Sequence, residues 1–188
     1  KNQFNLFAGQ QVFFKTMGFF DTHLLSDKGA FQKDTQFFTF YYLSCYESVI
    51  WFLSQNENFG VPFYKAIVGG WSNTKSQMRR NIYSDAVADI EILQTVAGAE
   101  MNCSDVRQFW VSWENGELKI GRGSIQDVEI ILNVKQECPY DIQNIGLSGG
   151  PYDAYWLFNK SKYSYIHTVL FKYSYKDIKN ELYTNTYE

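Results

Sequence analysis

Trp110 stands where an indole ring could take part in recognition. It lies in an expected strand, and Gly121 faces it across an expected hairpin, so the absent glycine side chain leaves room for the ring. Flat aromatic rings in such positions stack on sugars, and nearby Ser112, Lys119 and Arg122 would supply hydrogen bonds. The alternative is that Trp110 covers a strand glycine or packs beneath a loop.

Trp71 is a second candidate for recognition. It follows Gly69-Gly70 directly and stands close to Asn73. Loops held by a rigid scaffold often carry binding residues, so we interpret Trp71 and Asn73 as a loop-borne recognition pair. The alternative is that Trp71 anchors this loop to the body of the protein.

Other reactive side chains are few. The sequence contains two histidines, His23 and His167, which is few for a catalytic triad or a metal site. His167 falls in a tyrosine-rich segment, where we expect a histidine of the core or of an interface. Glu114 and Glu117 face each other beside a turn, which we interpret as a solvated hairpin tip rather than a glycosidase pair or calcium site. The sequence also contains no nucleotide-binding glycine motif and no calcium-loop motif, so we expect no catalytic residue, no metal and no cofactor.

The cysteines and glycosylation motifs point to an extracellular setting. Three cysteines allow one disulfide with a free thiol, or an intermolecular bridge. We expect Cys103 to pair with Cys138, because both flank the central hairpin, and Cys45 to be a buried thiol. Asn102 and Asn159 begin candidate N-glycosylation motifs. Together these features favour secretion.

Size, composition and charge narrow the class of protein. A chain of 188 residues is expected to form one domain, spanning 1–188. Aromatic residues make up 19% of the chain, with 14 Tyr and 16 Phe, which favours strands over helices. A net charge of −3 argues against nucleic-acid binding, and no apolar run is long enough to span a membrane. The chain begins at Lys1, as a processed secretory protein or a trimmed one would.

The stretch 109–122 predicts a β-hairpin. Asn115-Gly116 favours a type I′ turn, because both residues tolerate a positive φ. A two-residue loop then sets the register and places Trp110 opposite Gly121. Five apolar side chains are expected to share the core face of this hairpin: Phe109, Val111, Trp113, Leu118 and Ile120.

The rest of the chain also has the pattern of short strands. Expected strands cover 12–14, 23–25, 37–53 (as one strand or two), 63–68, 128–135, 145–148, 155–158 and 163–175. In 128–135, the alternation places Val128, Ile130, Leu132 and Val134 on one side. Residues 84–97 fit a helix or a strand, and we favour a strand; 176–183 fits a closing helical turn. Short strands without alternating helices predict an all-β antiparallel sandwich, similar to a jelly roll.

Three separated motifs resemble the farnesoic acid O-methyltransferase domain. They are Ala66-Ile67-Val68-Gly69-Gly70-Trp71-Ser72-Asn73-Thr74-Lys75-Ser76, then 109–113 with Gly116 and 120–123, then 145–148 with 156–158. The resemblance covers about 37–160, leaving 1–36 and 161–188 as additional strands or an oligomer contact. It implies a β-sandwich without a recognisable S-adenosylmethionine site, found in invertebrate and extracellular proteins, and it carries over no catalytic residue. The family name itself implies methyl transfer to a sesquiterpene acid.

Three functional hypotheses follow. The first is a secreted, lectin-like recognition module that binds a glycan or a protein surface without enzymatic activity. The second is a structural subunit that forms homo-oligomers through the tyrosine-rich segment at a sheet edge. The third is an enzyme acting on a small apolar substrate, which the family name alone supports.

Overall fold

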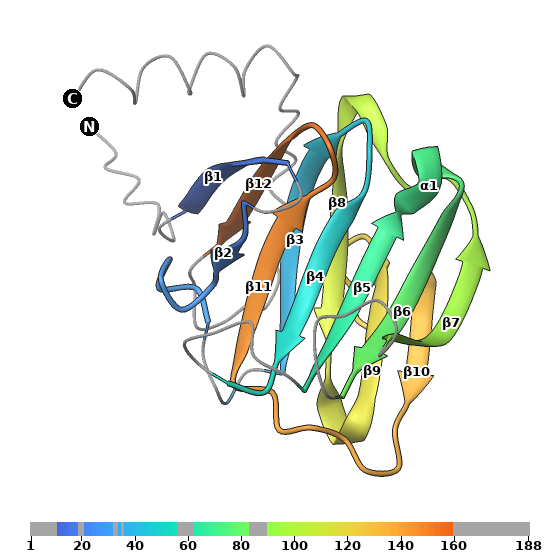
Figure 1. Cartoon of the computed structure of the whole chain (residues 1–188). Helices are drawn as coiled ribbons and strands as arrows, with labels where there is room; N and C mark the ends of the chain where they lie inside the picture. Colours follow the sequence, from blue (N-terminus) through green and yellow to red (C-terminus); the bar gives the residue numbers. More distant parts are fainter. Residues whose placement is uncertain are drawn as a thin grey trace.

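The chain forms a sandwich of two antiparallel sheets (Figure 1). The computed structural model describes residues 11–18, 21–31, 34, 36–55, 62–82 and 90–159. The strands are β1 (Gln11–Met17), β2 (His23–Leu24), β3 (Phe37–Ser44), β4 (Ser48–Leu53), β5 (Phe63–Gly69), β6 (Lys75–Asn81), β7 (Ile90–Ala97), β8 (Asn102–Ser112), β9 (Glu117–Arg122), β10 (Ile130–Lys135), β11 (Asn144–Gly149) and β12 (Asp153–Asn159). Short helical turns follow β5 (α1, Gly70–Asn73) and β8 (η2, Glu114–Gly116).

Over the described residues, each sheet has six strands. Sheet A runs in the order β1-β12-β3-β8-β9-β10, and sheet B runs β2-β11-β4-β5-β6-β7. Every strand pairing is antiparallel. The predicted all-β sandwich is therefore confirmed, and 37–53 proves to be two strands that pair in different sheets.

The central hairpin has the predicted register. Trp110 pairs with Gly121 and Ser112 pairs with Lys119. The turn residues Asn115 and Gly116 have φ values of 52° and 73°, as a two-residue hairpin turn requires. The five apolar side chains of its inner face are all buried.

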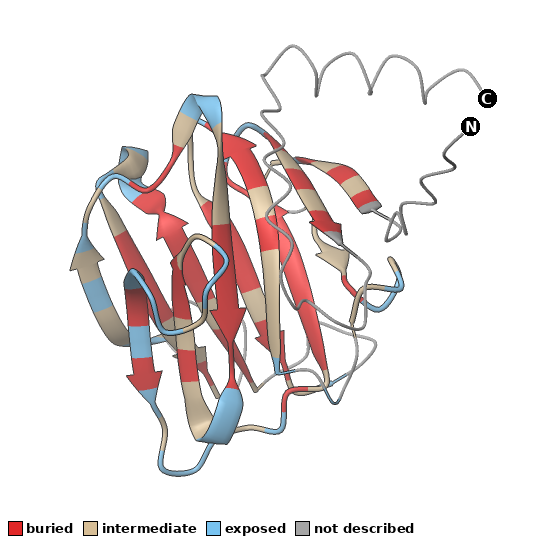
Figure 2. Ribbon diagram, turned by 180° about the vertical axis from the view of Figure 1, so that it is seen from behind, coloured by how far each residue is buried: buried red, intermediate tan, exposed pale blue. Residues whose placement is uncertain are grey.

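The core consists of inward side chains of both sheets. Figure 2 shows buried residues along the strands of both sheets. Aromatic rings fill its centre: Trp156 lies 5.2 Å from Phe40 and 4.5 Å from Tyr42, measured between ring centroids. Burying a ring of this size stabilises the fold by roughly 2–3 kcal/mol. Within the described part of the chain, aromatic side chains therefore form much of the interior of the sandwich.

The strand predicted at 128–135 differs from its expected pattern. Strand β10 begins at Ile130, and the pairing with β9 shifts between Ile130 and Leu132. This bulge inserts one residue, so Ile131 and Leu132 are both buried, whereas Ile130 and Val128 are exposed. The alternation predicted from the sequence holds only beyond the bulge.

Three further expectations fall partly or wholly outside the described residues. The strand interpretation of 84–97 is confirmed for β7, which covers 90–97. Residues 84–89 lie outside the described part, as do 163–175 with His167 and the helical turn at 176–183.

The disulfide joins Cys45 to Cys103, not Cys103 to Cys138 as predicted. Cys45 follows β3 directly, and β3 pairs with the start of β8, where Cys103 lies. The two cysteines are therefore neighbours, with 4.1 Å between their Cα atoms. Cys138 is an exposed free thiol in the loop before β11, and Cys45 is not the buried thiol that we expected.

Trp110 is completely buried against Gly121. Any Cβ at position 121 would overlap the indole ring. The backbone φ at Gly121 is not in the left-handed region, so the constraint is space alone.

We predict that Gly121→Ala lowers the free energy of unfolding by about 1–3 kcal/mol, because the added methyl group overpacks this contact. In a Trp110→Val background the same substitution should have an effect closer to zero, since the ring is gone. Urea unfolding of the four proteins measures the coupling. An equal effect in both backgrounds would show that the ring does not set the constraint.

Candidate functional site

The hairpin residues singled out from the sequence do not form an open binding surface. Trp110 and Ser112 are buried. The Trp110 Nε1 donates a hydrogen bond to the Val128 carbonyl at 2.8 Å, so the ring packs beneath the loop between β9 and β10. The sugar-stacking interpretation of Trp110 is therefore wrong, and the packing alternative is right.

Lys119 and Arg122, the two cations predicted as binding residues of the hairpin, are held in ion pairs. The Lys119 amine lies 2.9 Å from Glu117 and 2.8 Å from Asp127. Arg122 donates two hydrogen bonds of 2.7 Å to the buried carboxylate of Glu100. Both side chains stabilise the structure around the hairpin and have partners already.

Trp71 differs, because it is 40% exposed and sits in a strained turn. Within α1, the φ values of Trp71, Ser72 and Asn73 are 53°, 59° and 61°. Left-handed backbone disfavours residues with a Cβ by roughly 1–2 kcal/mol each, and successive non-glycine residues rarely adopt it. The surrounding contacts must therefore hold this conformation in place.

Asn73 supplies the main contacts that hold the turn. Its side-chain Nδ2 donates to the Met101 carbonyl at 2.9 Å, and its Oδ1 accepts from the Met101 N–H at 2.8 Å. The Thr74 hydroxyl donates to the Trp71 carbonyl at 2.8 Å. Asn73, predicted as a binding residue, has its amide engaged with the backbone, so it positions Trp71.

Cationic and aromatic side chains surround Trp71 on the outer face of sheet B, which faces the viewer in Figure 1. Trp51 on β4 pairs with Lys65 on β5, which pairs with Arg79 on β6. The Lys65 Nζ lies 4.1 Å from the centre of the Trp51 ring. The Lys75 Nζ and the Arg79 Cζ lie 4.2 Å and 5.2 Å from the Trp71 ring. These are cation–π distances.

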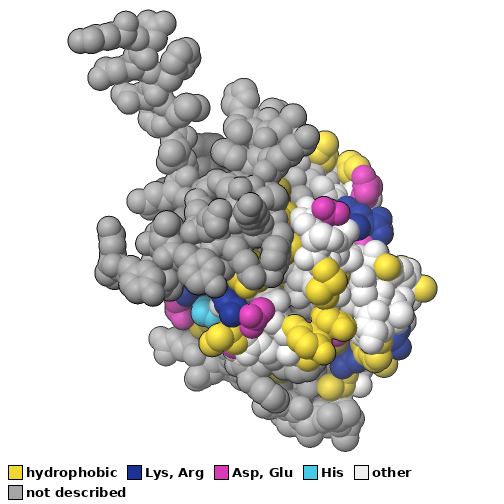
Figure 3. Space-filling view, turned by 90° about the horizontal axis from the view of Figure 1, so that it is seen from above, with side chains coloured by type: hydrophobic (Ala, Val, Ile, Leu, Met, Phe, Trp, Pro, Cys, Tyr) yellow, Lys and Arg dark blue, Asp and Glu magenta, His cyan; other side chains and the backbone are white. Residues whose placement is uncertain are grey.

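We call this surface the Trp71 face, made of Glu47, Trp51, Lys65, Trp71, Lys75 and Arg79. Figure 3 shows the molecule from above, the end at which α1 lies in Figure 1. On this side, Lys and Arg side chains lie close to exposed hydrophobic side chains.

The carboxylate of the Trp71 face is Glu47. It lies in the turn after β3, and the backbone N–H of Trp71 donates a hydrogen bond to it. Burial raises the pKa of Glu47, while Lys65, this hydrogen bond and Arg79 act in the opposite direction. Glu47 is thus a half-buried carboxylate whose pKa is affected by the charges of two cations, Lys65 and Arg79.

Lys65 is the most perturbed cation of the Trp71 face. Burial, and after it the charge of Arg79, lower its pKa to about 8, and the charge of Glu47 acts in the opposite direction. Burial also lowers the pKa of Arg79. The Arg79 guanidinium donates two hydrogen bonds, of 2.9 and 2.8 Å, to the neutral oxygen of Gln77. The face therefore holds positive charge that its own carboxylate balances only in part.

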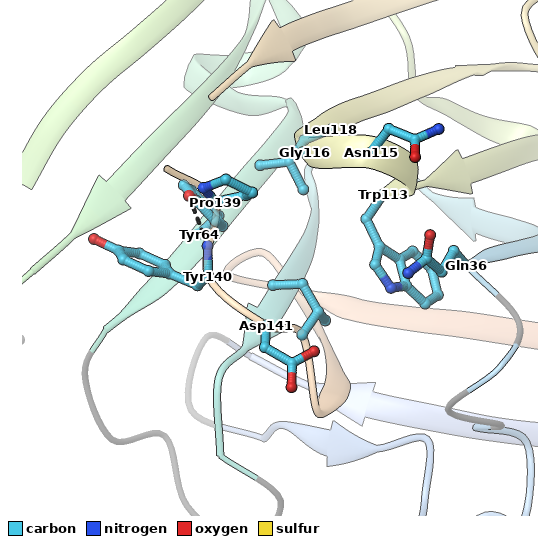
Figure 4. A pocket seen from close by; sticks show the side chains of 10 residues that line it. Gln36, Tyr64, Trp113, Asn115, Gly116, Leu118, Pro139, Tyr140 and Asp141 are labelled. Carbon is cyan, nitrogen blue, oxygen red and sulfur yellow. Dashed lines mark hydrogen bonds between the residues drawn. The ribbon is translucent and has the colours of Figure 1, made fainter. Parts of the chain in front are cut away.

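A cavity of about 400 Å³ opens at the other end of the sandwich, beside the hairpin tip (Figure 4). Tyr64, Trp113 and Tyr140 contribute aromatic walls, and Tyr64 stacks on Tyr140 at 4.7 Å. Gln36 and Asp141 add polar groups (Figure 4). The described lining contains no histidine, cysteine or lysine, so it offers space without a cluster of reactive groups.

Sequence reasoning missed this cavity and most of the Trp71 face. One signal was present: Lys65 places a cation within the otherwise apolar and aromatic strand β5. Over the described residues, no group of His, Cys, Asp and Glu side chains is arranged to hold a metal ion. No helix in the described part of the chain has the length and apolarity needed to span a bilayer.

We predict that Lys65→Met stabilises the protein at pH 7 by about 1–3 kcal/mol, because it removes a charge that burial disfavours and keeps the aliphatic stem on Trp51. The folded-state pKa is below the ordinary value, so the wild-type penalty is complete below pH 8 and is relieved as the pH rises from about 8 to 10.5. The advantage of the variant should shrink across that window in urea unfolding.

The matched control for this measurement is Lys119→Met. The pKa of Lys119 is raised by Asp127 and Glu117, so the loss of this amine should leave stability unchanged or lower it. A Lys65→Met protein less stable than wild type at pH 7 would mean that the buried charge is fully compensated.

Comparison with known proteins places the chain in a family. Uncharacterized protein 5 from Haliotis asinina is 26% identical over 132 residues, which are 70% of this chain and 72% of that protein. The carbohydrate binding module CBM66 from Bacillus subtilis aligns with a TM-score of 0.46 and 9% identity, over 66% of this chain and 76% of that one. A Bacillus licheniformis beta-glucanase aligns with a TM-score of 0.41 and 14% identity, over 66% and 63%.

The family described as Farnesoic acid 0-methyl transferase matches residues 15–162, a longer span than the 37–160 expected from the motifs. This match begins within β1, at Lys15, and includes all the other described strands of both sheets. Because the match covers well over half of the sequence, the chain belongs to the Farnesoic acid 0-methyl transferase family.

Proposed function

We propose that the chain is a recognition module that binds carbohydrate on the Trp71 face. The observation that carries the proposal is the strained turn that holds a half-exposed indole ring beside two cations. Backbone strain of this kind is concentrated at functional sites, where pre-organisation offsets its cost. A buried loop anchor would not need it, because an anchor can adopt a relaxed turn.

The chemistry of the Trp71 face matches that of a sugar. A sugar ring has an apolar C–H face and a rim of hydroxyl groups, so its site needs an aromatic surface next to donors and acceptors. Trp71 supplies the aromatic surface, Lys75 and Arg79 supply donors, and Glu47 supplies an acceptor. Strands β5 and β6 carry three of the charged groups, which favours a rigid site.

We also propose that the protein acts outside the cell. The Cys45–Cys103 disulfide supports this setting, because structural disulfides form and persist where the environment is oxidising. Glycosylation at Asn102 and Asn159 stays a prediction. So does assembly through 163–175, a segment outside the described residues.

Glycan-array binding followed by calorimetry on the best glycan tests the proposal. We expect Trp71→Ala to weaken binding by up to about tenfold, since an aromatic stacking contact contributes about 0.5–1.5 kcal/mol. Trp71→Tyr keeps an aromatic surface and should retain most of the affinity.

The matched control is Ile125→Ala, which removes an exposed apolar side chain from the loop beyond β9, away from the Trp71 face. Its affinity should equal that of the wild type. Absence of binding to every glycan on the array, or full binding by a folded Trp71→Ala protein, would refute the proposed function.

A further inference from the structure

We propose that the ligand of the Trp71 face carries an acidic group, a carboxylate or a sulfate, which binds between Lys65 and Arg79. This inference rests on the proposed function and adds the chemical class of the ligand. It is drawn from how these two cations are placed and from what balances their charge.

Lys65 and Arg79 are direct cross-strand partners on neighbouring strands. Ala66 and Met78, their neighbours in sequence, are buried in the core, so alternation directs the two cations to the outer face. Like charges placed directly opposite each other in a sheet destabilise it. An anion between them would convert this repulsion into two attractions.

The charge of this pair is not balanced within the described structure. Among the described residues, no carboxylate lies within 4.0 Å of the Lys65 amine or the Arg79 guanidinium, the limit for a salt bridge. Glu47 raises the pKa of Lys65 and of Arg79 from a longer distance, and its carboxylate already accepts a hydrogen bond from the backbone N–H of Trp71. With Lys75 beside Trp71, the face carries three cations and one carboxylate.

Both cations keep donors for a ligand. Arg79 uses its Nε and Nη2 on the Gln77 oxygen, and a guanidinium has five N–H donors in total. The ammonium group of Lys65 lies over the ring of Trp51, a weaker partner than a carboxylate. An oxyanion has several acceptor oxygens and suits this pair, because charge-assisted hydrogen bonds are the strong ones.

The acidic group and the sugar belong to one ligand. Arg79 is the residue shared by both parts of the face, since it faces Lys65 across the strands and also lies 5.2 Å from the Trp71 ring. A sugar stacked on Trp71 would therefore bring a charged substituent into the space between Lys65 and Arg79. Neutral glycans would leave the two cations uncompensated.

The first experiment compares acidic and neutral glycans on one array, at 50 mM and 200 mM salt. We expect binding to acidic glycans at least tenfold stronger than to neutral ones, and weaker at the higher salt concentration. The best acidic glycan is then compared with its carboxyl-reduced or desulfated form, which shows which acidic group is recognised.

Substitutions of Lys65 and Arg79 test where the acidic group of the ligand binds. Lys65→Gln and Arg79→Gln should each reduce binding of the acidic glycan by about tenfold or more and leave binding of its neutralised form unchanged. Lys135→Gln, an exposed cation on β10, is the matched control and should bind like the wild type. Near-ultraviolet circular dichroism confirms that each variant is folded.

A second measurement needs no glycan. The Lys65 amine, whose pKa is about 8 beside Arg79 and Glu47, is titrated by NMR in 0.1 M sodium sulfate and in sodium chloride of equal ionic strength. Inorganic sulfate seated between the cations should raise this pKa, because a nearby anion favours the charged amine.

The outcomes separate the two proposals. Equal binding of acidic and neutralised glycans, or a Lys65 pKa that sulfate does not change, would overturn the acidic-group inference and leave carbohydrate recognition standing. Absence of binding to every glycan, with a pKa that sulfate does raise, would instead refute carbohydrate recognition and retain the anion site.

Discussion

The pair of hydrogen bonds between the Asn73 amide and the Met101 backbone is the constraint on which the candidate site depends. It fixes the end of β5–β6 in sheet B to the segment that leads into β8 of sheet A. Three successive left-handed residues would otherwise relax to a more common turn. The position of Trp71, and hence the surroundings of Lys75 and Arg79, follows from this one side chain.

The rest of the site follows from the period of a β-strand. Successive side chains point to opposite faces, so β5 places Ala66 in the core and Lys65 outside it, and β6 does the same with Met78 and Arg79. The hydrophobic core fixes the register of these strands, because a slip of one residue would bury the cations. Packing energy thus aligns the two positive charges even though they repel each other.

Local patterns in the sequence were sufficient to predict the fold class and the hairpin register. Asn115-Gly116 specifies its own turn, and strand alternation specifies the inner face of the hairpin. The sequence could not show that the loop after β9 folds over Trp110, or that Cys45 lies beside Cys103, because both depend on contacts between distant segments. The bulge in β10 likewise depends on pairing with β9.

The candidate site was predictable at one position, Trp71. Its cationic neighbours come from separate strands, and only the order of strands in sheet B brings Lys65 beside Arg79. The Gly-Gly-Trp motif marked a turn, but the left-handed backbone of a tryptophan is a feature that local propensity disfavours. Functional positions are often those where local preference and the final structure disagree.

The Cys45–Cys103 bond has a consequence for how the protein is made. Cys45 precedes Glu47 by two residues, and Cys103 follows Met101 by two. One covalent bond therefore connects the segment that carries Glu47 to the segment whose backbone holds Asn73 and the Trp71 turn. Material produced in a reducing bacterial cytosol would lack this disulfide bond. The choice of expression host therefore decides whether this bond is present next to the Trp71 face.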